Sequence, residues 1–245
     1  NSNGRITVEI FPSAQLGSQE DNVASLANNS LEMTCVNSTI LNTISPSTMM
    51  LACPALFANE EECDAVLASE WGQNFWDNVA KESGVRVLSA FCNGMRSFTT
   101  SNKELTTVDS AKGVTFRVMP SAVYEKMVEA IGANPVPMPG SEMYTAMQNG
   151  TVDGQENPYM NIVGNNLQEV QSQIIQSYHG SMTYILMANL DWFNGLPEDV
   201  QAAIIEAEKY GREKSREAYA AKSHTISGKT VGIIGIGNIG RRVAA

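Results

Sequence analysis

The sequence lacks the features that would place the chain in a membrane or on nucleic acid. It contains no uninterrupted run of about 18 apolar residues, so no membrane-spanning helix is expected. Acidic side chains outnumber basic ones by 26 to 16, which gives a formal net charge of −10. A protein that binds nucleic acid needs a basic surface instead. An acidic surface favours solubility and still allows one or two buried arginines to hold an acidic ligand.

Motifs for catalysis are also lacking. The chain has no Gly-x-Ser-x-Gly elbow, no His-Glu-x-x-His helix and no Cys/His pairing. Three adjacent carboxylates, Glu60, Glu61 and Glu62, fall at the expected start of a helix, where negative charge complements the helix dipole. The sequence therefore predicts a protein that is not an enzyme.

The cysteines show no metal-binding pattern, since none has Cys-x-x-Cys spacing and His179 and His224 are far away in sequence. The cysteines are Cys35, Cys53, Cys63 and Cys92. Three of them lie in apolar runs, which is typical of small buried side chains. An exported location would permit a disulfide, but the sequence does not select the pair.

The N-terminus has no basic region followed by an apolar core, so it does not resemble a signal peptide. We expect any export signal to have been removed or to lie outside this sequence. A length of 245 residues, with 43% apolar and 17% charged residues, suits a globular protein of two medium lobes or one large domain.

In the first part of the chain, the apolar spacing predicts strands alternating with helices. The expected strands are 6–11, 31–36 and 85–90, and the expected helices are 21–29 and a longer helix from Asn59 to residue 80. Residues 49–57 form a further apolar run, interrupted by Pro54. This order indicates a parallel sheet with helices on its faces.

A second unit is expected from about residue 93. Its predicted elements are a strand at 113–118, a helix at 121–131 with Ser121 as N-cap, an edge strand at 134–138, and a helix at 141–148 with Ser141 as cap. An apolar strand at 184–188 then returns to the first unit, and a long helix covers 197–222. We therefore predict a two-lobe α/β fold, with lobe I formed by 1–92 and 184–223 and lobe II by 93–183. Two chain crossings would make a hinge, and the interlobe cleft would hold a ligand.

One residue of the 113–118 strand is charged, Arg117. Downstream, residues 141–158 read SEMYTAMQNGTVDGQENP, a short helix and a polar turn. A strand with a single arginine beside such a turn indicates a cleft with one buried cation. Because a guanidinium group matches a carboxylate through two parallel hydrogen bonds, we expect a small acid as ligand. The alternative is an arginine that points to solvent on the other face of the strand.

Four separated motifs resemble the solute-binding proteins of tripartite ATP-independent periplasmic (TRAP) transporters. They are NGRITVEIFPSAQLG (3–17), NGMRSFTTSNKEL (93–105), FRVMPS with the later QNGTVDGQENP, and GLPEDVQAAI (195–204). The resemblance implies the two-lobe periplasmic-binding fold, with lobe I lacking its first strand and helix. It also implies a periplasmic location, TRAP membrane subunits as partners, and a sugar acid, dicarboxylate or sialic-acid-like ligand.

The resemblance further implies which residues contact the ligand. Arg117 is the expected carboxylate clamp, Asn157 contacts the acid group, and Arg96 holds the acid or a neighbouring hydroxyl. Further candidates are Asn37, Tyr184 and Ser121. Some family members have an acidic residue at the place of Asn37, and the asparagine suits a hydroxyl better than an amine. The alternatives are a surface Arg96, a turn-forming Asn157, a core Tyr184 and a helix-capping Ser121. Glu156 and Asp153 are expected to be structural caps.

The last segment, 224–245, departs from this pattern. An apolar strand at 229–234 is followed by Gly235, Gly237 and Gly240 in GxGxxG spacing, and the segment resembles the NAD-binding start of D-2-hydroxyacid dehydrogenases. The acidic residue expected about 20 positions later is absent from the sequence, so we expect a vestigial site and no cofactor. We also expect the tail strand to fill the vacant first-strand position of lobe I.

Three hypotheses follow from the sequence. The first is a receptor that captures a small carboxylate for a TRAP transporter. The second is a fragment of an NAD-dependent 2-hydroxyacid oxidoreductase, which rests on the glycine-rich tail alone. The third is a non-functional fusion of the two pieces. Stabilisation by an acid would favour the first hypothesis, and stabilisation by NADH would favour the second.

Overall fold

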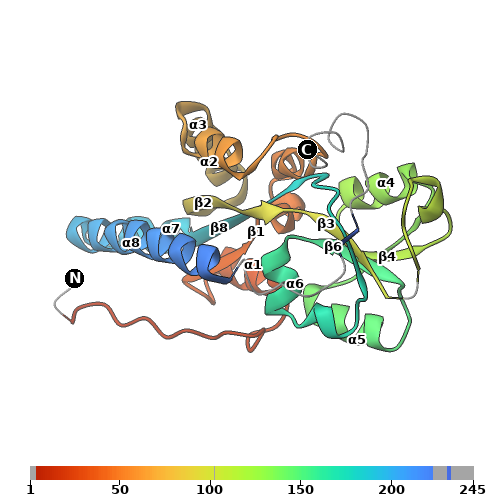
Figure 1. Ribbon diagram of the computed structural model, residues 1–245. Coiled ribbons are helices and arrows are strands. Elements are labelled where there is room, and N and C mark those ends of the chain that lie inside the picture. The colour runs from red at the N-terminus through yellow and green to blue at the C-terminus, as the bar shows by residue number, and fades with distance from the viewer. Residues whose placement is uncertain (1–3, 102, 223–230, 233–245) are drawn as a thin grey trace.

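The computed structural model describes residues 4–101, 103–222 and 231–232 of the chain. The strands of this part form two sheets, which lie next to each other in Figure 1 with helices packed around them. The smaller sheet has the order β1-β8-β2, and the larger has the order β5-β4-β6-β3-β7-β9. The predicted α/β class is confirmed.

The three-stranded sheet consists of β1 (Met33–Asn37), β8 (Ser181–Asn189) and β2 (Val85–Met95). The central strand β8 runs antiparallel to both neighbours, and its Tyr184 lies between Asn37 of β1 and Phe91 of β2. The prediction of a parallel sheet here is therefore wrong. Strands β1 and β2 follow each other in sequence, but the returning strand β8 inserts between them in the opposite direction.

Several helices surround this sheet, and α8 is the longest (Figure 1). They are α1 (Gln19–Ala27), α2 (Glu60–Ala68), α3 (Glu70–Ser83), α7 (Leu190–Gly195) and α8 (Glu198–Lys222). Local capping sets their boundaries: Ser18 forms a capping box with Asp21, and Asn59 caps α2. The single helix predicted from Asn59 to residue 80 is two helices, because Ser69 has an extended backbone and caps α3.

The predicted strand at 6–11 is not formed. Val8 and Ile10 of this stretch are 70% and 78% exposed, and no strand of the described residues pairs with them. The apolar run at 49–57 contributes instead to η2 (Pro46–Ala52), a 3₁₀ helix that follows η1 (Ser38–Thr43). Its apolar content reflects burial of residues such as Leu51 against the core.

The larger sheet contains both parallel and antiparallel pairs. Its strands are β5 (Asn134–Pro137), β4 (Thr115–Val118), β6 (Gly154–Asn157), β3 (Ser97–Thr100), β7 (Gln173–Ile175) and β9 (Val231–Gly232). Strand β4 is parallel to β5 and β6, and β3 is antiparallel to β6 and β7. The predicted edge strand at 134–138 is confirmed as β5. Gly154 allows the close approach of β6 to β3, since a Cβ at this position would lie 2.0 Å from the carbonyl oxygen of Thr99.

Within the residues that the structure describes, the helices that accompany the larger sheet are α4 (Ala122–Ala130), α5 (Met143–Gln148) and α6 (Tyr159–Gly164). The prediction of Ser121 at the N-cap position of α4 is confirmed, although its side chain makes no capping hydrogen bond. The prediction of Ser141 as the cap of the next helix is wrong. Helix α5 begins at Met143 after the short 3₁₀ helix η4 (Gly140–Glu142), so Ser141 lies inside η4 and Glu142 takes the N-cap position.

The described part of the tail is β9, which pairs in parallel with β7. This pairing places Val231 and Gly232 on the six-stranded sheet, so the prediction that the tail strand fills the sheet of lobe I is wrong. An edge strand such as β7 offers free backbone groups that a short parallel segment can bind. The glycine motif formed by Gly235, Gly237 and Gly240 lies outside the described residues.

The chain passes between the two sheets at adjoining places. Strand β2 ends at Met95 and β3 begins at Ser97, so only Arg96 separates them. On the return, residues 176–180 connect β7 to β8. The backbone N–H of Arg96 donates to the carbonyl oxygen of Gly180 at 2.7 Å and holds these two connections together. Arg96 therefore lies at the junction of the sheets.

Candidate functional site

The guanidinium group of Arg96 is completely buried and paired with Glu156 of β6. Its Nη2 donates to Oε1 of Glu156 at 2.6 Å and to the backbone oxygen of Glu156 at 2.9 Å, and its Nε donates to Oε2. The ring of Tyr124 lies beneath, with its centroid 4.6 Å from the guanidinium carbon. The alternative of a surface Arg96 is therefore wrong. The Nη1 atom is buried without a hydrogen-bond partner in the described part of the chain.

A histidine from the return connection completes the environment of Glu156. Nε2 of His179 lies 3.2 Å from Oε2 of Glu156, and Nδ1 lies 2.7 Å from the hydroxyl of Ser177. A carboxylate only accepts hydrogen bonds, so Nε2 carries a proton in this contact. The imidazole ring also stacks on Phe98, with the centroids 4.4 Å apart. Arg96, Glu156 and His179 thus bind the two connections between the sheets to strand β6.

The pKa values of this cluster show where its charges reside. Burial alone would raise the pKa of Glu156, but Arg96 and His179 outweigh it and lower the pKa to about 2. Burial alone would lower the pKa of Arg96, but Glu156 outweighs it and raises the pKa above its usual value. The pair is ionised at neutral pH, and each charge is compensated within the protein.

Arg117 lies in the interior of the larger sheet and is only 2% exposed. Its Nε and Nη2 donate to the carbonyl oxygen of Met138, at 3.0 and 2.7 Å. Gly140 leaves room beside the guanidinium, since a Cβ there would lie 3.8 Å from Nη2. No carboxylate of the described residues forms an ion pair with Arg117. Burial accordingly lowers the pKa of Arg117 to about 10, against the attraction of Glu156.

Strand pairing brings the predicted site residues of the larger sheet together. Asn157 lies opposite Ser97, next to Arg96, and Arg117 lies opposite Gln155 on the other side of β6. The Asn157 side chain is buried; its Nδ2 donates to Oε1 of Gln155 and lies 3.5 Å from the sulfur of Met143. These bonds reach other side chains, so the alternative of an asparagine that bonds its own turn is wrong.

Ser121 is buried at the start of α4, and its hydroxyl has no hydrogen-bond partner in the described residues. A buried hydroxyl without a partner costs free energy, so such an atom is a candidate for contact with a ligand or water. Three residues further along α4, Tyr124 packs on Arg96. Ser121 therefore begins the helix that borders the arginine cluster.

Asn37 and Tyr184 face the same region from the smaller sheet. They are register partners of β1 and β8. Oδ1 of Asn37 accepts from the backbone N–H of Thr39 at 2.9 Å, while its Nδ2 is buried without a partner in the described residues. Burial raises the pKa of Tyr184, and the charge of Arg96 acts against this rise. The ring of Tyr184 is half-buried and stacks on Phe91, 6.3 Å away, as expected for the alternative of a packed aromatic.

Sequence reasoning missed three members of this cluster: Glu156, His179 and Tyr124. Glu156 does not cap a helix; it is the counter-ion of Arg96. Asp153 does not cap a helix either, because its carboxylate accepts from the backbone N–H of Thr115 and joins β4 to β6. The available signal was the position of Glu156 directly before Asn157. Which residue it pairs with depends on the β3–β6 register, which the sequence does not state.

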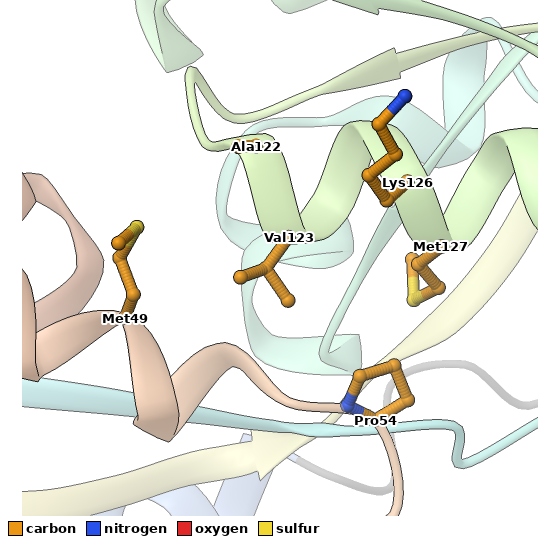
Figure 2. Close-up of a pocket in the computed structure, with 6 residues that line it drawn as sticks. All are labelled: Met49, Pro54, Ala122, Val123, Lys126 and Met127. Atoms are coloured by element: carbon orange, nitrogen blue, oxygen red, sulfur yellow. The ribbon is translucent and has the colours of Figure 1, made fainter.

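An apolar cavity of about 490 Å³ lies near the cluster but differs from it chemically. Figure 2 shows Met49 and Pro54 on one side and the side chains of α4 on the other, with the amine of Lys126 turned away. The lining residues are Met49, Pro54, Ala122, Val123, Lys126 and Met127. Such a lining offers no buried cation for a carboxylate. The polar cluster around Arg96 and Arg117 is therefore the candidate site for an acid.

The described residues contain no group of three or more histidine, cysteine, aspartate or glutamate side chains placed to hold a metal ion. In the same part of the chain, none of the helices combines the length and the apolar character that a membrane crossing requires.

Comparison with known proteins identifies the family. Residues 1–235 match the model of the bacterial extracellular solute-binding proteins, family 7, so the chain belongs to this family. A curated relative is a solute-binding protein of Roseobacter denitrificans, which is 32% identical over 216 residues, covering 88% of this chain and 66% of the relative. The chain thus spans about two thirds of the length of such relatives.

Solved structures of TRAP solute-binding proteins share the fold. The sugar-acid-binding protein of Advenella mimigardefordensis, in complex with galactonate, is 30% identical with a TM-score of 0.89; the match covers 99% of this chain and 81% of that one. A periplasmic protein of Shewanella oneidensis with bound succinate is 27% identical with a TM-score of 0.90, over 98% of this chain and 81% of that one. The resemblance predicted from the motifs is confirmed at the level of family and fold.

Proposed function

We propose that this chain captures a small organic acid between two lobes and delivers it to the membrane subunits of a TRAP transporter. Lobe I would contain the three-stranded sheet and lobe II the strands β3 to β7. The crossings at Arg96 and at residues 176–180 would serve as the hinge. This division follows the bounds 1–92 with 184–223 for lobe I and 93–183 for lobe II, except that 93–95 of β2 and 181–183 of β8 go with the three-stranded sheet. The proposed location is the periplasm, as the names of relatives state for those proteins.

The observation that carries the proposal is the buried guanidinium of Arg117, which no carboxylate of the described residues neutralises. A buried charge without a partner is costly, and a bound anion removes that cost. Arg96 and Arg117 supply two positive charges and Glu156 supplies one negative charge, which leaves one positive charge for a ligand carboxylate. Arg117 already donates to Met138 through Nε and Nη2, so its remaining N–H groups are those proposed to bind the acid.

The other proposed contacts come from buried donors that have no partner in the described residues. They are Nη1 of Arg96, Nδ2 of Asn37 and the hydroxyl of Ser121. Asn157 would turn its amide from Gln155 to the acid group. A site with several neutral donors around one cation suits hydroxylated acids, and relatives were solved with galactonate and succinate. We therefore propose sugar acids first and dicarboxylates second as ligands.

The chemistry of the site supports binding without turnover. The arginines of the cluster are permanently charged, and its carboxylate and imidazole are tied into the Arg96–Glu156–His179 chain of hydrogen bonds. A general base needs a carboxylate or imidazole that is free to accept a proton from a substrate. We propose that the chain is a receptor and not an enzyme.

Thermal unfolding against a panel of acids tests the proposal. The panel comprises galactonate, galacturonate, glucuronate, succinate and sialic acid, with galactitol as an uncharged match for galactonate and NADH as the test of the dehydrogenase hypothesis. A ligand at about 100 times its dissociation constant adds about 2.7 kcal/mol to the free energy of unfolding. We expect stabilisation by an acid that Arg117→Met abolishes, and none by galactitol. Stabilisation by NADH alone, or by galactitol as strongly as by galactonate, would contradict the proposal.

A further inference from the structure

Two of the four cysteines lie together beside the junction of the sheets. Cys63 belongs to α2 and is completely buried, and Cys92 belongs to the end of β2 and is half-buried. Cys35 and Cys53, in contrast, are exposed. Cys63 and Cys92 come from elements that pack against each other, although they are distant in sequence. The structure thus separates one pair from the four cysteines that the sequence left equivalent.

Two independent contacts fix Cys63 over Cys92. The sulfur of Cys63 lies 3.8 Å from the hydroxyl oxygen of Thr183, and Thr183 is the register partner of Cys92 in the antiparallel β2–β8 pair. Side chains of such partners stand next to each other on one face of a sheet. The residue after Cys63, Asp64, accepts a hydrogen bond from the backbone N–H of Cys92 at 2.8 Å. The first turns of α2 are therefore seated directly on the strand at Cys92.

We propose that Cys63 and Cys92 form a disulfide that links α2 to β2 when the chain meets an oxidising disulfide. The link would lie four residues before Arg96, where β2 passes into β3. It would hold helix α2 on the strand that forms the first crossing between the sheets. This site is separate from the proposed acid site, so either proposal can fail without the other.

The reaction balances through thiol–disulfide exchange with a protein or small-molecule disulfide. The more accessible Cys92 attacks one sulfur of the oxidant as its thiolate, the oxidant's disulfide bond breaks, and the departing sulfur takes a proton. Cys63 then attacks the Cys92 sulfur of the mixed disulfide and releases the second oxidant sulfur. Two protein thiols are oxidised to one disulfide, and the oxidant disulfide is reduced to two thiols.

The electrostatics of the two reduced thiols bear on the first step. A side-chain hydrogen bond with Cys92 lowers the pKa of Cys63, and the same bond raises the pKa of Cys92. In the reduced protein Cys63 is therefore the first of the two to ionise, whereas the form of Cys92 that attacks the oxidant is its thiolate. The raised pKa of Cys92 makes the first step slow, so the oxidant must be present in excess.

Peptide mapping of the full chain tests the proposal. The native protein is incubated with excess glutathione disulfide until the thiol count is constant, alkylated, and cut after lysine, arginine and glutamate. Cys63 then falls in the peptide 63–70, Cys92 in 87–96, and Cys35 with Cys53 in 33–60. We expect one linked product of 63–70 and 87–96, lighter by two hydrogen atoms than the sum of its parts. Free thiols at both positions, a Cys35–Cys53 bond instead, or glutathione retained on Cys92 would each overturn the proposal.

Melting temperatures give a second readout that does not depend on a variant folding. The oxidised protein should melt roughly 5–10 °C above the same protein treated with reductant, because the bond closes a long loop of the unfolded chain. Cys63→Ser and Cys92→Ser should lose this difference, and Cys35→Ser and Cys53→Ser should keep it. If the difference in melting temperature survives in Cys63→Ser, the link belongs to other cysteines. If the unmodified protein shows no difference, no such link forms.

Discussion

Arg96, directly before β3, and Arg117 of β4 are both buried arginines on opposite sides of strand β6, yet their surroundings differ. Arg96 has a carboxylate, an aromatic ring and a backbone oxygen around it. Arg117 has one backbone carbonyl oxygen and no ion-pair partner among the described residues. The pKa of Arg96 is raised, and that of Arg117 is lowered to about 10. Burial is common to both, so the difference comes from the counter-charge.

We interpret this difference as the distinction between a structural charge, Arg96, and the proposed binding charge, Arg117. The protein compensates Arg96 itself, and the resulting ion pair joins the two crossings between the sheets. Arg117 is held in place by Met138, and its proposed neutralisation is by a bound acid. Buried charges are usually paired, so a buried and uncompensated one identifies a place for an anion. We therefore expect the loss of Glu156, the partner of Arg96, to reduce mainly the stability of the protein. We expect the loss of Arg117 to reduce mainly the binding of the acid.

The largest effect is expected from Glu156→Gln. This change keeps the shape of the side chain but leaves Arg96 buried without its counter-charge. Breaking a buried ion pair from one side costs about 3–5 kcal/mol of stability. Urea unfolding of the protein without ligand would measure the loss. A matched control is Glu129→Gln, whose exposed pair with Lys126 should matter little. A loss below about 1 kcal/mol would show that Glu156 does not hold the junction.

The pH dependence of stability tests the same pair without relying on a variant alone. The pKa of Glu156 is about 2 in the folded protein, below the usual value of 4.5. A carboxyl group with a lowered folded pKa contributes stability above its unfolded pKa and loses it as the pH falls through the folded value. Stability should therefore decline between about pH 4.5 and 2, and Glu156→Gln should remove this part of the decline. Urea midpoints are measured at several pH values for the unmodified protein and for Glu156→Gln. If Glu156 does not cause this part of the decline, the two curves of midpoint against pH will be parallel.

Arg117→Met should weaken acid binding much more than it changes stability. Losing the guanidinium removes a buried charge, but it leaves the carbonyl oxygen of Met138 unbonded, at a cost of about 1–3 kcal/mol. These contributions oppose each other, so the stability of the ligand-free protein should change by only about 1 kcal/mol. Acid binding should weaken by about 2–5 kcal/mol, because the ligand carboxylate loses its buried partner. Calorimetric titration with the acid selected by the panel measures the second effect. Unchanged affinity would end the role proposed for Arg117.

The sequence predicted Arg117 because its signal is local. A single charge within an apolar strand already indicates a buried or a functional residue. The edge strand β5 was likewise predicted from a local signal, the two prolines of 134–138. The family motifs then pointed to Arg96 and Asn157. All three are buried in the structure, and Asn157 is adjacent to the ion pair.

The partners of these residues depend on contacts between distant parts of the chain. Glu156 was interpreted as a cap because nothing near it in sequence shows that β3 places Arg96 beside it. His179 reaches the same carboxylate from the return connection. The antiparallel insertion of β8 between β1 and β2 also depends on distant contacts, since the order of elements does not state which strands pair. The sequence therefore predicted neither the partners of Arg96 nor the direction of β8.

A smaller effect is expected from Asn157→Ala. The amide of Asn157 would contribute one hydrogen bond to the acid, worth about 0.5–1.5 kcal/mol, so affinity should fall by roughly 2- to 13-fold. Asn134→Ala on the edge strand β5 is the matched control, because Asn134 is exposed and bonds the backbone of Gly113. A titration in which both variants bind alike would remove Asn157 from the site. A loss as large as that of Arg117→Met would make the asparagine an equal partner in the clamp.

The smallest effect is expected from deleting residues 225–245. In the described part of the chain, this deletion removes β9, which adds a two-residue parallel pair to the edge of the larger sheet at β7. Strand β7 keeps its antiparallel pairing with β3, and the acid site keeps all its proposed residues. Stability should fall by less than about 1 kcal/mol, and the affinity for the acid should not change. A large fall in melting temperature would show that the tail supports the sheet beyond this pair. A loss of acid binding would show that the tail takes part in the acid site. The contrast between Arg96 and Arg117 would then not account for acid binding by itself.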